Sequence, residues 1–361
     1  MAQLKLGLVG LGFGLGYMRS YLQSSAAQSL VIVQAACDTD SARVAAAVTA
    51  FGCRAFASLD QMLAEADIDA VALFTGPAGR AELVRKIIRS GRHVMTTKPF
   101  ELDAEAAMSV LQEAKQLGKF IHMNSPSATP RADVRCIEQW QTAHELGRPL
   151  SAHFQTWVNY REAADGRWYD DPDRCPVAPI FRLGIYAIND ILQFLHEPET
   201  VHVMESRLFT GRPTPDHAQL AIRFRGGELA SVFASFCTET QVPYPDRLTL
   251  TFERGCVYRN ATPQASRLHT VLQLVAPGKD GKPLTEQAEF DGEAQSGHGS
   301  YQWDVFARAI RGEAIADLVS AEQIVSGVEV IDAMSRSAHS GQPERVGDRA
   351  VRSAVVPAAK K

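Results

Sequence analysis

The chain has 361 residues, which is more than one compact hydrophobic core usually holds, so we expect two domains. Hydrophobic residues make up 45% of the sequence and charged residues 22%, as in an ordinary globular protein. The net charge of -4 supplies no basic surface for nucleic acid or for an anionic membrane, so we expect neither partner. No apolar run reaches the ~18 residues that a membrane-spanning helix needs.

The spacing of the cysteines and histidines predicts neither disulfide bonds nor a metal site. The six cysteines are scattered and form no Cys-x-x-Cys pair, so we expect free thiols in a reducing cytoplasm. The ten histidines show no His-Glu-x-x-His pattern or comparable ligand spacing, and we expect no metal site. The apolar start of the chain does not resemble a secretory signal peptide, because a single lysine precedes it and its glycines weaken a helix.

The chain opens with a predicted strand, a glycine-rich turn and a predicted helix. Residues 4–10 are short, apolar and end in glycine, which is typical of a buried parallel strand, and residues 17–27 predict a helix. In the turn between them, Gly10 permits a tight bend and Gly12 lets a pyrophosphate approach the backbone. The start of the helix supplies free N–H groups and the positive end of the helix dipole.

The glycine spacing departs from the Gly-x-Gly-x-x-Gly pattern of dinucleotide sites. Counted from Gly10, the third position is Leu15, with Gly14 and Gly16 on either side, so close helix–strand packing would use a shifted register. A glycine-rich turn without a ligand is the alternative. The residues expected to form the floor of a cofactor site are Gly10, Gly12, Phe13, Gly14 and Leu15.

An acidic residue ends the second predicted strand, residues 30–38. Asp38 lies at about the distance from the glycine turn expected of the carboxylate that binds the adenosine ribose hydroxyls. A carboxylate there repels a 2′-phosphate, and no arginine directly follows it, so we expect NAD rather than NADP. In the alternative interpretation Asp38 only caps the next helix, a role equally open to Asp40.

Strands and helices continue to alternate up to residue 124. Strands are predicted at residues 70–75, 93–97 and 120–124, with helices between them, which is the pattern of a doubly wound parallel sheet. We therefore expect a Rossmann dinucleotide-binding domain over residues 1–124. Ligands of such sheets bind at the carboxyl ends of the strands. The polar residues at or just beyond those predicted ends are Asp38, Thr75, Lys98 and Asn124.

The most specific stretch is HVMTTKPFELDAEAA, residues 93–107. Lys98 follows a buried strand, and Pro99 restricts it to extended geometry. At the ligand edge of a sheet, a lysine supplies either a fixed positive charge or a titratable group. A solvated loop lysine is the alternative, because most lysines are exposed.

With these motifs the chain resembles the Gfo/Idh/MocA oxidoreductases over nearly its whole length. The resemblance rests on the glycine turn, on DIDAVALFTGP and GRHVMTTKPF, on RLGIYAINDILQFL and on YQWDVFARAIRGE. It implies a Rossmann domain followed by an α+β domain, residues 125–361, with a large, mostly antiparallel sheet. It also implies a nicotinamide cofactor, a sugar-like substrate and a homodimer or homotetramer built through the open face of that sheet.

The resemblance carries over to individual residues, with departures. The family's lysine–proline signature maps onto Lys98 and Pro99, but Thr97 stands where the family usually has glutamate. Its second signature helix maps onto Arg182 and Tyr186, and this arginine stands where the family usually has aspartate. The resemblance therefore implies a largely intact cofactor site, in which Thr75, Gly76, Lys98, Pro99 and Asn124 take part, and an altered substrate site.

Four residues are candidate substrate contacts, namely Arg182, Asn189, Trp168 and Tyr160. Arg182, Tyr186 and Asn189 recur at helical spacing on a polar stripe, which faces either the cleft or water. The resemblance implies the cleft for Tyr186 and Asn189. Trp168 lies in the long loop that starts at Tyr160, and such loops are often functional, although Trp168 could simply pack against its domain.

Oxidation of a secondary alcohol needs a hydride acceptor and a base for the hydroxyl proton. The resemblance makes Tyr186 the candidate base, with Lys98 lowering its pKa from the ordinary value of about 10. The reverse assignment, with Lys98 as acid/base and Tyr186 as an orienting donor, fits the same residues. Arg182 cannot accept a proton. It could lower the pKa of Tyr186 further, grip a carboxylate or phosphate of a sugar acid, or form a surface ion pair with Asp170 or Asp171.

We therefore expect an NAD(P)-dependent dehydrogenase that transfers a hydride between the cofactor and a sugar, polyol or sugar acid. Two other functions stay open, because a fold does not fix a function. One is a sensor that binds the cofactor without turnover, and the other is redox-neutral cleavage of glycosides through transient oxidation. Retention of Lys98 and Tyr186 favours an enzyme.

Overall fold

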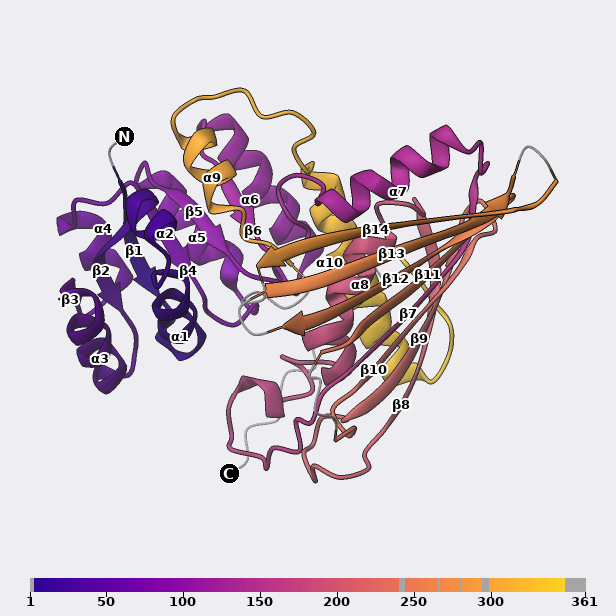
Figure 1. The fold of residues 1–361 in the computed structure, drawn as a ribbon. Helices are drawn as coiled ribbons and strands as arrows, with labels where there is room; N and C mark the ends of the chain where they lie inside the picture. The colour runs from indigo at the N-terminus through magenta and orange to yellow at the C-terminus, as the bar shows by residue number, and fades with distance from the viewer. Residues whose placement is uncertain (1–2, 240–243, 265–266, 279–280, 294–298, 348–361) are drawn as a thin grey trace, which may run out of the picture.

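The computed structural model describes residues 3–239, 244–264, 267–278, 281–293 and 299–347 (Figure 1). A parallel sheet comes from the first third of the chain, and a larger sheet comes from the remainder. Within these residues, no helix combines the length and the apolar character that crossing a membrane requires.

The first sheet has six parallel strands in the order β3-β2-β1-β4-β5-β6, which is the strand order of a Rossmann dinucleotide-binding domain. The central strands are apolar and almost wholly buried, as expected of strands covered on both faces. The predicted doubly wound sheet is confirmed. Its strands are β1 (Leu4–Val9), β2 (Val31–Cys37), β3 (Arg54–Phe56), β4 (Ala70–Leu73), β5 (His93–Thr96) and β6 (Ile121–Met123).

Helices cover both faces of this sheet (Figure 1). One face packs against α4, α5 and α6 in a single apolar cluster, and the other packs against α1, α3 and a helix from the end of the chain, α9. The bounds are α1 (Leu11–Tyr21), α2 (Ser25–Leu30), α3 (Ser41–Phe51), α4 (Leu59–Glu65), α5 (Arg80–Arg89), α6 (Ala104–Gln116) and α9 (Trp303–Ile310).

The glycine run differs from its prediction as a turn. Helix α1 begins at Leu11 rather than near residue 17, so Gly12, Gly14 and Gly16 are helical. Gly10 is the residue before the helix, and its φ of 84° is a left-handed conformation that favours glycine. Each glycine inside a helix costs about 1 kcal/mol relative to alanine, so close packing or a ligand has to offset that cost.

The second sheet is large and mostly antiparallel, as the resemblance implies. Its nine strands follow the order β14-β13-β12-β11-β7-β10-β9-β8-β15, and among the neighbouring pairs β7 and β10 run parallel. The strands are β7 (Pro149–Trp157), β8 (Pro198–Ser206), β9 (His217–Phe224), β10 (Leu229–Ser235), β11 (Asp246–Phe252), β12 (Gly255–Gln264), β13 (Arg267–Pro277), β14 (Pro283–Glu293) and β15 (Glu344–Arg345).

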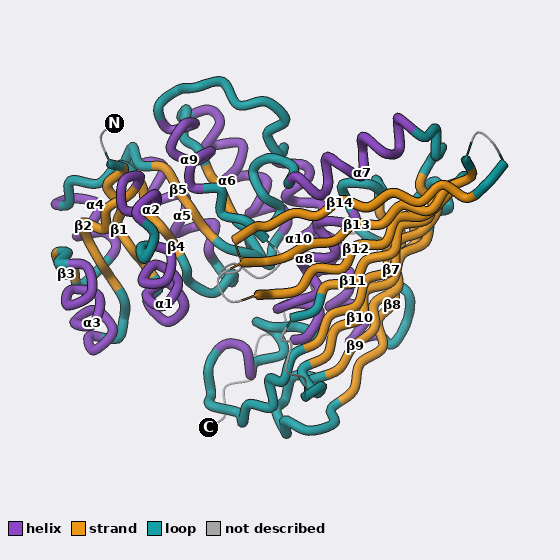
Figure 2. Tube along the Cα trace, viewed as in Figure 1, coloured by secondary structure: helices purple, strands orange, loops and turns teal. Residues whose placement is uncertain are grey.

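Helices cover one face of this second sheet (Figure 2). They are α7 (Ala132–Ala143), α8 (Ile185–Ile191) and α10 (Ala321–Ser340), and a π-helical turn, Ile180–Gly184, leads into α8. Their apolar residues share one core with the inward residues of the strands. The strands alternate between buried and more exposed residues, as in a sheet packed on one face.

The end of the chain returns to the first domain. The aromatic residues Tyr301, Trp303 and Phe306 pack beside β1 and α1, and the Trp303 indole donates a hydrogen bond of 2.7 Å to the Tyr17 hydroxyl. Helix α10 spans both cores, because its first half packs in the cluster of α5 and α6 and its second half packs under the large sheet. The two domains are therefore joined by packing as well as by the chain.

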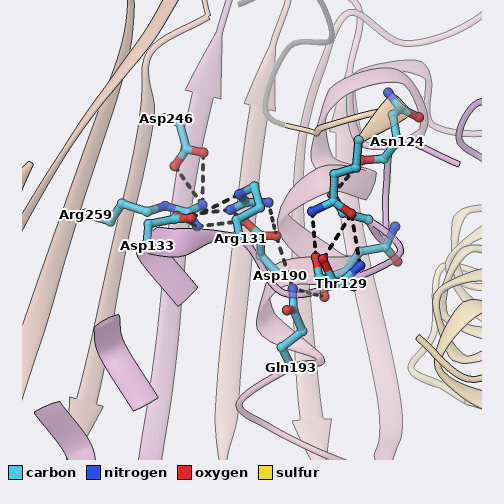
Figure 3. A network of polar contacts seen from close by, with 11 residues as sticks. Asn124, Thr129, Arg131, Asp133, Asp190, Gln193, Asp246 and Arg259 are labelled. Carbon is cyan, nitrogen blue, oxygen red and sulfur yellow. Dashed lines mark hydrogen bonds and ion pairs between the residues drawn. The ribbon is translucent and has the colours of Figure 1, made fainter. Parts of the chain in front are cut away.

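A buried network of charges fixes helix α8 to the large sheet (Figure 3). Arg259 of β12 lies 2.7 Å from the Asp190 carboxylate and 2.9 Å from that of Asp246. Arg131, just before α7, lies 2.9 Å from Asp190 and 3.1 Å from Asp133. Buried charges are tolerated when they are paired in this way, so the network fixes the position of the helix that carries Tyr186.

Candidate active site

Gly10 brings the glycine turn into direct contact with the loop after β4. A Cβ atom at Gly10 would lie 2.6 Å from the backbone carbonyl carbon of Phe74 and 2.8 Å from the Thr75 nitrogen. Together with the positive φ, this contact excludes every side chain at residue 10. The turn therefore sits against the carboxyl end of β4, where Rossmann domains bind their cofactors.

Close packing of α1 on the sheet uses Gly14, one residue before the expected third position. A Cβ at Gly14 would lie 2.7 Å from a ring carbon of Phe74, whereas nothing lies within 4 Å of one at Gly16. Leu15 is half-buried in the neighbouring core. Phe13 is 50% exposed and stacks on Tyr17 with ring centroids 5.8 Å apart. The shifted register proposed from the sequence is what the structure contains.

Asp38 holds the glycine turn. Its Oδ2 accepts a 2.6 Å hydrogen bond from the Leu11 amide, and its Oδ1 accepts one of 2.9 Å from the Asp40 amide. The cap of α3 is Asp40, whose carboxylate accepts hydrogen bonds from the amides of Ala42 and Arg43. The interpretation of Asp38 as a helix cap is therefore wrong, and its contact with a ribose stays a prediction.

These residues fit a dinucleotide. In the described part of the chain no side chain caps α1 at Gly10, so the amides of its first turn beyond Leu11 are available to a pyrophosphate. Gly12 and Phe13 are exposed at this helix start. Gly12 would hold the phosphates by backbone contact, and the carboxylate of Asp38 stands at the end of β2 for the ribose.

The loop after β4 faces a tryptophan from the second domain. The indole of Trp168 lies 3.7 Å from where a Cβ of Gly76 would be, which is ordinary van der Waals contact. Trp168 is half-buried and also meets Phe181 edge to face, with ring centroids 6.3 Å apart. The predicted cofactor residue Gly76 thus lies beside Trp168 of the predicted substrate loop.

Lys98 is at the centre of the polar groups between the domains. Its Nζ donates a hydrogen bond to the backbone carbonyl of Arg182 and lies 4.5 Å from the centre of the Tyr186 ring. Burial, followed by the nearby Arg182 guanidinium, lowers the pKa of Lys98 to about 7, against an opposite effect of Cys175. The lysine amine can therefore gain or lose a proton near neutral pH.

Asn124 connects the lysine to Tyr186. The side-chain oxygen of Asn124 accepts a 3.1 Å hydrogen bond from the Lys98 amide, and its side-chain nitrogen donates one of 3.1 Å to the Tyr186 hydroxyl. Pro99 follows Lys98 through a cis peptide bond and is buried. The structure thus brings together four predicted residues, Lys98, Pro99, Asn124 and Tyr186.

The geometry does not support the predicted activation of Tyr186 by Lys98, which stays a prediction. The lysine contacts the face of the ring, and the hydroxyl instead interacts with Asn124. Burial raises the pKa of Tyr186 well above its ordinary value of 10, in the opposite direction from the one that a base needs. Of the two assignments left open by the sequence, the geometry favours Lys98 as the acid/base.

Arg182 is held by protein groups. Its guanidinium lies over the rings of Tyr160, Tyr169 and Phe236 at 4.8, 5.0 and 4.9 Å, and it lies 3.4 Å from the Glu162 carboxylate. The expected ion pair therefore exists, but its partner is Glu162 rather than Asp170 or Asp171. Asp170 instead pairs with Arg212 at 3.1 Å, and Arg212 also lies 3.1 Å from Glu162.

The other two candidate substrate residues differ in position. Tyr160 lies in the group around Arg182, and its hydroxyl is hydrogen-bonded to that of Tyr244. Asn189 instead lies beside Ser125 and helix α10. Its amide donates to the Ser125 hydroxyl at 3.0 Å, and its oxygen would lie 2.2 Å from a Cβ at Gly327 of α10. These contacts favour a packing role for Asn189.

Several residues of this region carry no local signal in the sequence. They are brought here by contacts between distant segments, as for Glu162 and Arg212 above. Gly299 is another example, because a Cβ there would lie 2.3 Å from the Asn124 carbonyl oxygen and 2.9 Å from Cε1 of Tyr186. Arg80, buried at the start of α5, is a third and contacts both loops of the site.

Comparison with known families agrees with this geometry. Residues 4–125 match the model of an oxidoreductase family with an NAD-binding Rossmann fold, and residues 134–258 match the GFO/IDH/MocA C-terminal domain. The chain belongs to the GFO/IDH/MocA oxidoreductase family. The resemblance seen in the sequence is confirmed, and the N-terminal domain of this family member is an NAD-binding Rossmann fold.

Curated relatives of this family member are distant. An uncharacterized oxidoreductase of Schizosaccharomyces pombe is 24% identical over 230 residues, which is 60% of the length of each protein. Inositol 2-dehydrogenase 1 of Mycolicibacterium vanbaalenii is 25% identical over 71% of this chain and 72% of its own length. UDP-N-acetylglucosamine 3-dehydrogenase of Acidithiobacillus ferrooxidans is 32% identical, over 32% of this chain and 35% of its own.

Solved structures share the whole architecture. GenD2 from gentamicin A biosynthesis, in complex with NAD, has a TM-score of 0.74 at 19% identity, over 96% of this chain and 97% of its own. The WlbA dehydrogenase of Bordetella pertussis, in complex with NADH and UDP-GlcNAcA, has a TM-score of 0.71 at 17% identity, over 95% of this chain and 99% of its own. At these identities the likeness supports the two-domain fold.

Proposed function

We propose that this protein is an NAD-dependent dehydrogenase that interconverts a hydroxyl and a carbonyl group on a sugar or polyol. The observation that carries the proposal is Lys98, a half-buried lysine just beyond the carboxyl end of β5, whose Nζ donates to the Arg182 carbonyl and whose pKa is lowered to about 7. A lysine held near neutrality serves as an acid or a base at physiological pH. The curated relatives named above, which include an inositol dehydrogenase and a nucleotide-sugar dehydrogenase, support the substrate class.

Lys98 moves the proton in this proposal. Bound NAD supplies a nicotinamide ring that accepts or returns a hydride. In oxidation, the neutral Lys98 amine takes the proton of the substrate hydroxyl, and in reduction the ammonium returns it. Tyr186, whose hydroxyl is the weaker acid here, orients the substrate oxygen beside the amine. Asn124 fixes both residues through its hydrogen bonds to the Lys98 amide and the Tyr186 hydroxyl.

An uncharged substrate fits the charges better than a sugar acid. The Arg182 guanidinium was the expected anion contact, but the carboxylate of Glu162 lies 3.4 Å from it. A substrate carboxylate would have to compete with Glu162 for the same guanidinium. Arg182 and Arg212 together face the two carboxylates of Glu162 and Asp170, so this cluster offers no excess positive charge.

We also propose that the protein works in the cytoplasm as a homodimer or homotetramer built through the open face of the large sheet. Large apolar residues are exposed on strands of this sheet, namely Met204, Leu229 and Tyr258 at 69, 56 and 38%. Each alternates along its strand with buried neighbours, so each points away from the helices. Light scattering of the purified protein would test the assembly.

The activity is tested by NADH absorbance with purified protein, NAD and a panel of neutral sugars, polyols, aldonates and sugar phosphates. A signal that requires Lys98 and is largest with neutral substrates is the expected result. Absence of turnover with every compound, together with tight NAD binding, would overturn the proposal in favour of a sensor. Cleavage of glycosides without net formation of NADH would overturn it in favour of a redox-neutral enzyme.

A further inference from the structure

Arg80 links the two loops that carry the candidate active site. It is the first residue of α5, follows the loop after β4, and is 1% exposed. Its Nη1 donates to the backbone carbonyls of Thr97 at 2.5 Å and Phe100 at 3.2 Å, and also to that of Pro99. Its Nη2 donates to the carbonyl of Thr75. One guanidinium therefore holds the chain on both sides of Lys98 and the last residue before Gly76.

Glu101 makes the reciprocal link. This carboxylate follows the lysine loop, is 2% exposed, and accepts hydrogen bonds from the amides of Gly79 at 3.1 Å and Ala81 at 2.7 Å. It thereby binds the start of α5, while Arg80 from the start of α5 binds the lysine loop. The loop after β4 and the loop after β5 are thus cross-linked twice, by charged groups that are both buried.

The Arg80 charge also acts on the lysine. Burial lowers the pKa of Arg80 to about 10, with Glu101 acting in the opposite direction, so the guanidinium stays charged at neutral pH. Around the Lys98 amine, Arg182 and Arg80 oppose the ammonium form, while Cys175 and the face of the Tyr186 ring favour it. Arg80 is the cation among these groups that also fixes the lysine backbone.

We propose that Arg80 is a positioning residue for the reaction: by its hydrogen bonds to both loops it fixes Lys98 at a set distance from the cofactor-side loop at Thr75–Gly76. The proposal rests on the proposed role of Lys98 as the acid/base. A buried arginine that only stabilised the fold would affect melting temperature and yield. One that positions Lys98 must also change the pH range of turnover and the affinity for NAD.

The test compares Arg80→Met and Arg80→Lys with Arg85→Met, a control on the same helix whose half-buried side chain pairs with Glu113 of α6. For each protein the pH profile of kcat in the oxidation direction, the dissociation constant of NADH from its fluorescence, and the melting temperature are measured. We expect Arg80→Met to move the inflection of the profile to higher pH, because a charge that opposes the ammonium is gone. We expect Arg80→Lys to keep the inflection and to lose about tenfold to a hundredfold in kcat, because one ammonium cannot hold both loops.

An unchanged inflection in Arg80→Met, or wild-type kcat and NADH affinity in Arg80→Lys, would overturn the proposal. If Arg80→Met does not fold, the Arg80→Lys protein tests the proposal. Only a positioning role would lower the NADH affinity of Arg80→Lys while the inflection of its pH profile stays in place. A wild-type profile without an inflection near neutral pH, or one that Lys98→Met does not abolish, would instead overturn the proposed function.

Discussion

The Lys98 amine lies against the face of the Tyr186 ring, 4.5 Å from its centre, and not beside its hydroxyl. The two residues therefore do not form the lysine–tyrosinate pair that would make tyrosine the base. Burial and Arg182 favour the neutral amine and lower the lysine pKa to about 7, against the opposite effect of Cys175. Because burial raises the pKa of Tyr186, its hydroxyl keeps its proton and can donate a hydrogen bond to the substrate.

Replacing Tyr186 by phenylalanine is expected to lower kcat about tenfold while leaving the inflection of the pH profile in place. The hydroxyl is lost as an orienting donor, and the partner of the Asn124 amide is lost with it, but the acid/base is retained. Steady-state kinetics across pH measures both quantities. Disappearance of the inflection in Tyr186→Phe would show that tyrosine is the base after all.

Removing the carboxylate of Glu162 is expected to shift substrate preference toward acidic sugars. In Glu162→Gln the Arg182 guanidinium loses the ion pair of 3.4 Å and becomes free to bind a substrate carboxylate. The ratio of kcat/KM for aldonates to that for neutral polyols is expected to rise about tenfold. Asp173→Asn, an exposed change on the same loop, serves as the control. An unchanged ratio in Glu162→Gln would contradict the claim that Glu162 neutralises Arg182 and so disfavours acidic substrates.

Gly10, just before α1, and Gly16, within it, are expected to differ sharply in their tolerance of alanine. Gly10→Ala forces a left-handed residue and a contact of 2.6 Å with the Phe74 backbone, so we expect lost NAD affinity and a less stable protein. Gly16→Ala has open space around its Cβ, and we expect a gain of about 0.5–1 kcal/mol in unfolding free energy with NAD affinity unchanged. Equal effects of the two changes, by NADH titration and urea unfolding, would contradict this.

The network around Arg259 is expected to dominate the stability of the second domain. Arg259→Met removes the guanidinium and leaves the buried carboxylates of Asp190 and Asp246 without it, which typically costs about 3–5 kcal/mol. Arg225→Met, which breaks an exposed pair with Glu197, should cost less than about 1 kcal/mol. Urea unfolding compares the two proteins, and a similar small loss in both would be the contrary result.

The first domain was largely predictable because its signals are local. Short apolar strands alternate with helices, and the polar residues at the strand ends, Thr75, Lys98 and Asn124, meet at one edge of the sheet for topological reasons. The glycine run was predicted as a turn since its glycines are poor helix formers. Gly14 lets helix α1 pack closely on Phe74, and this contact between separate elements has no signal in the local sequence.

The surroundings of the lysine were not predictable from local patterns. Whether Lys98 meets the ring or the hydroxyl of Tyr186 depends on how two domains pack, and no spacing in the sequence encodes that. Glu162 and Arg80 act through contacts with residues 20 positions away, Arg182 and Phe100 respectively. Similarly, the aromatic residues of α9 read as an ordinary amphipathic helix, although they belong to the core of the first domain.

The decisive measurement is the pH dependence of NAD reduction by the wild-type protein and by Lys98→Met, with the best neutral sugar or polyol as substrate. With the neutral amine as the proposed base, kcat for oxidation should rise as pH increases through about 7, and the reverse reduction should fall over the same range. Lys98→Met should lose about a hundredfold or more in kcat and show no inflection there. A Lys98→Met protein with the wild-type profile and rate would contradict the assignment of Lys98 as the acid/base.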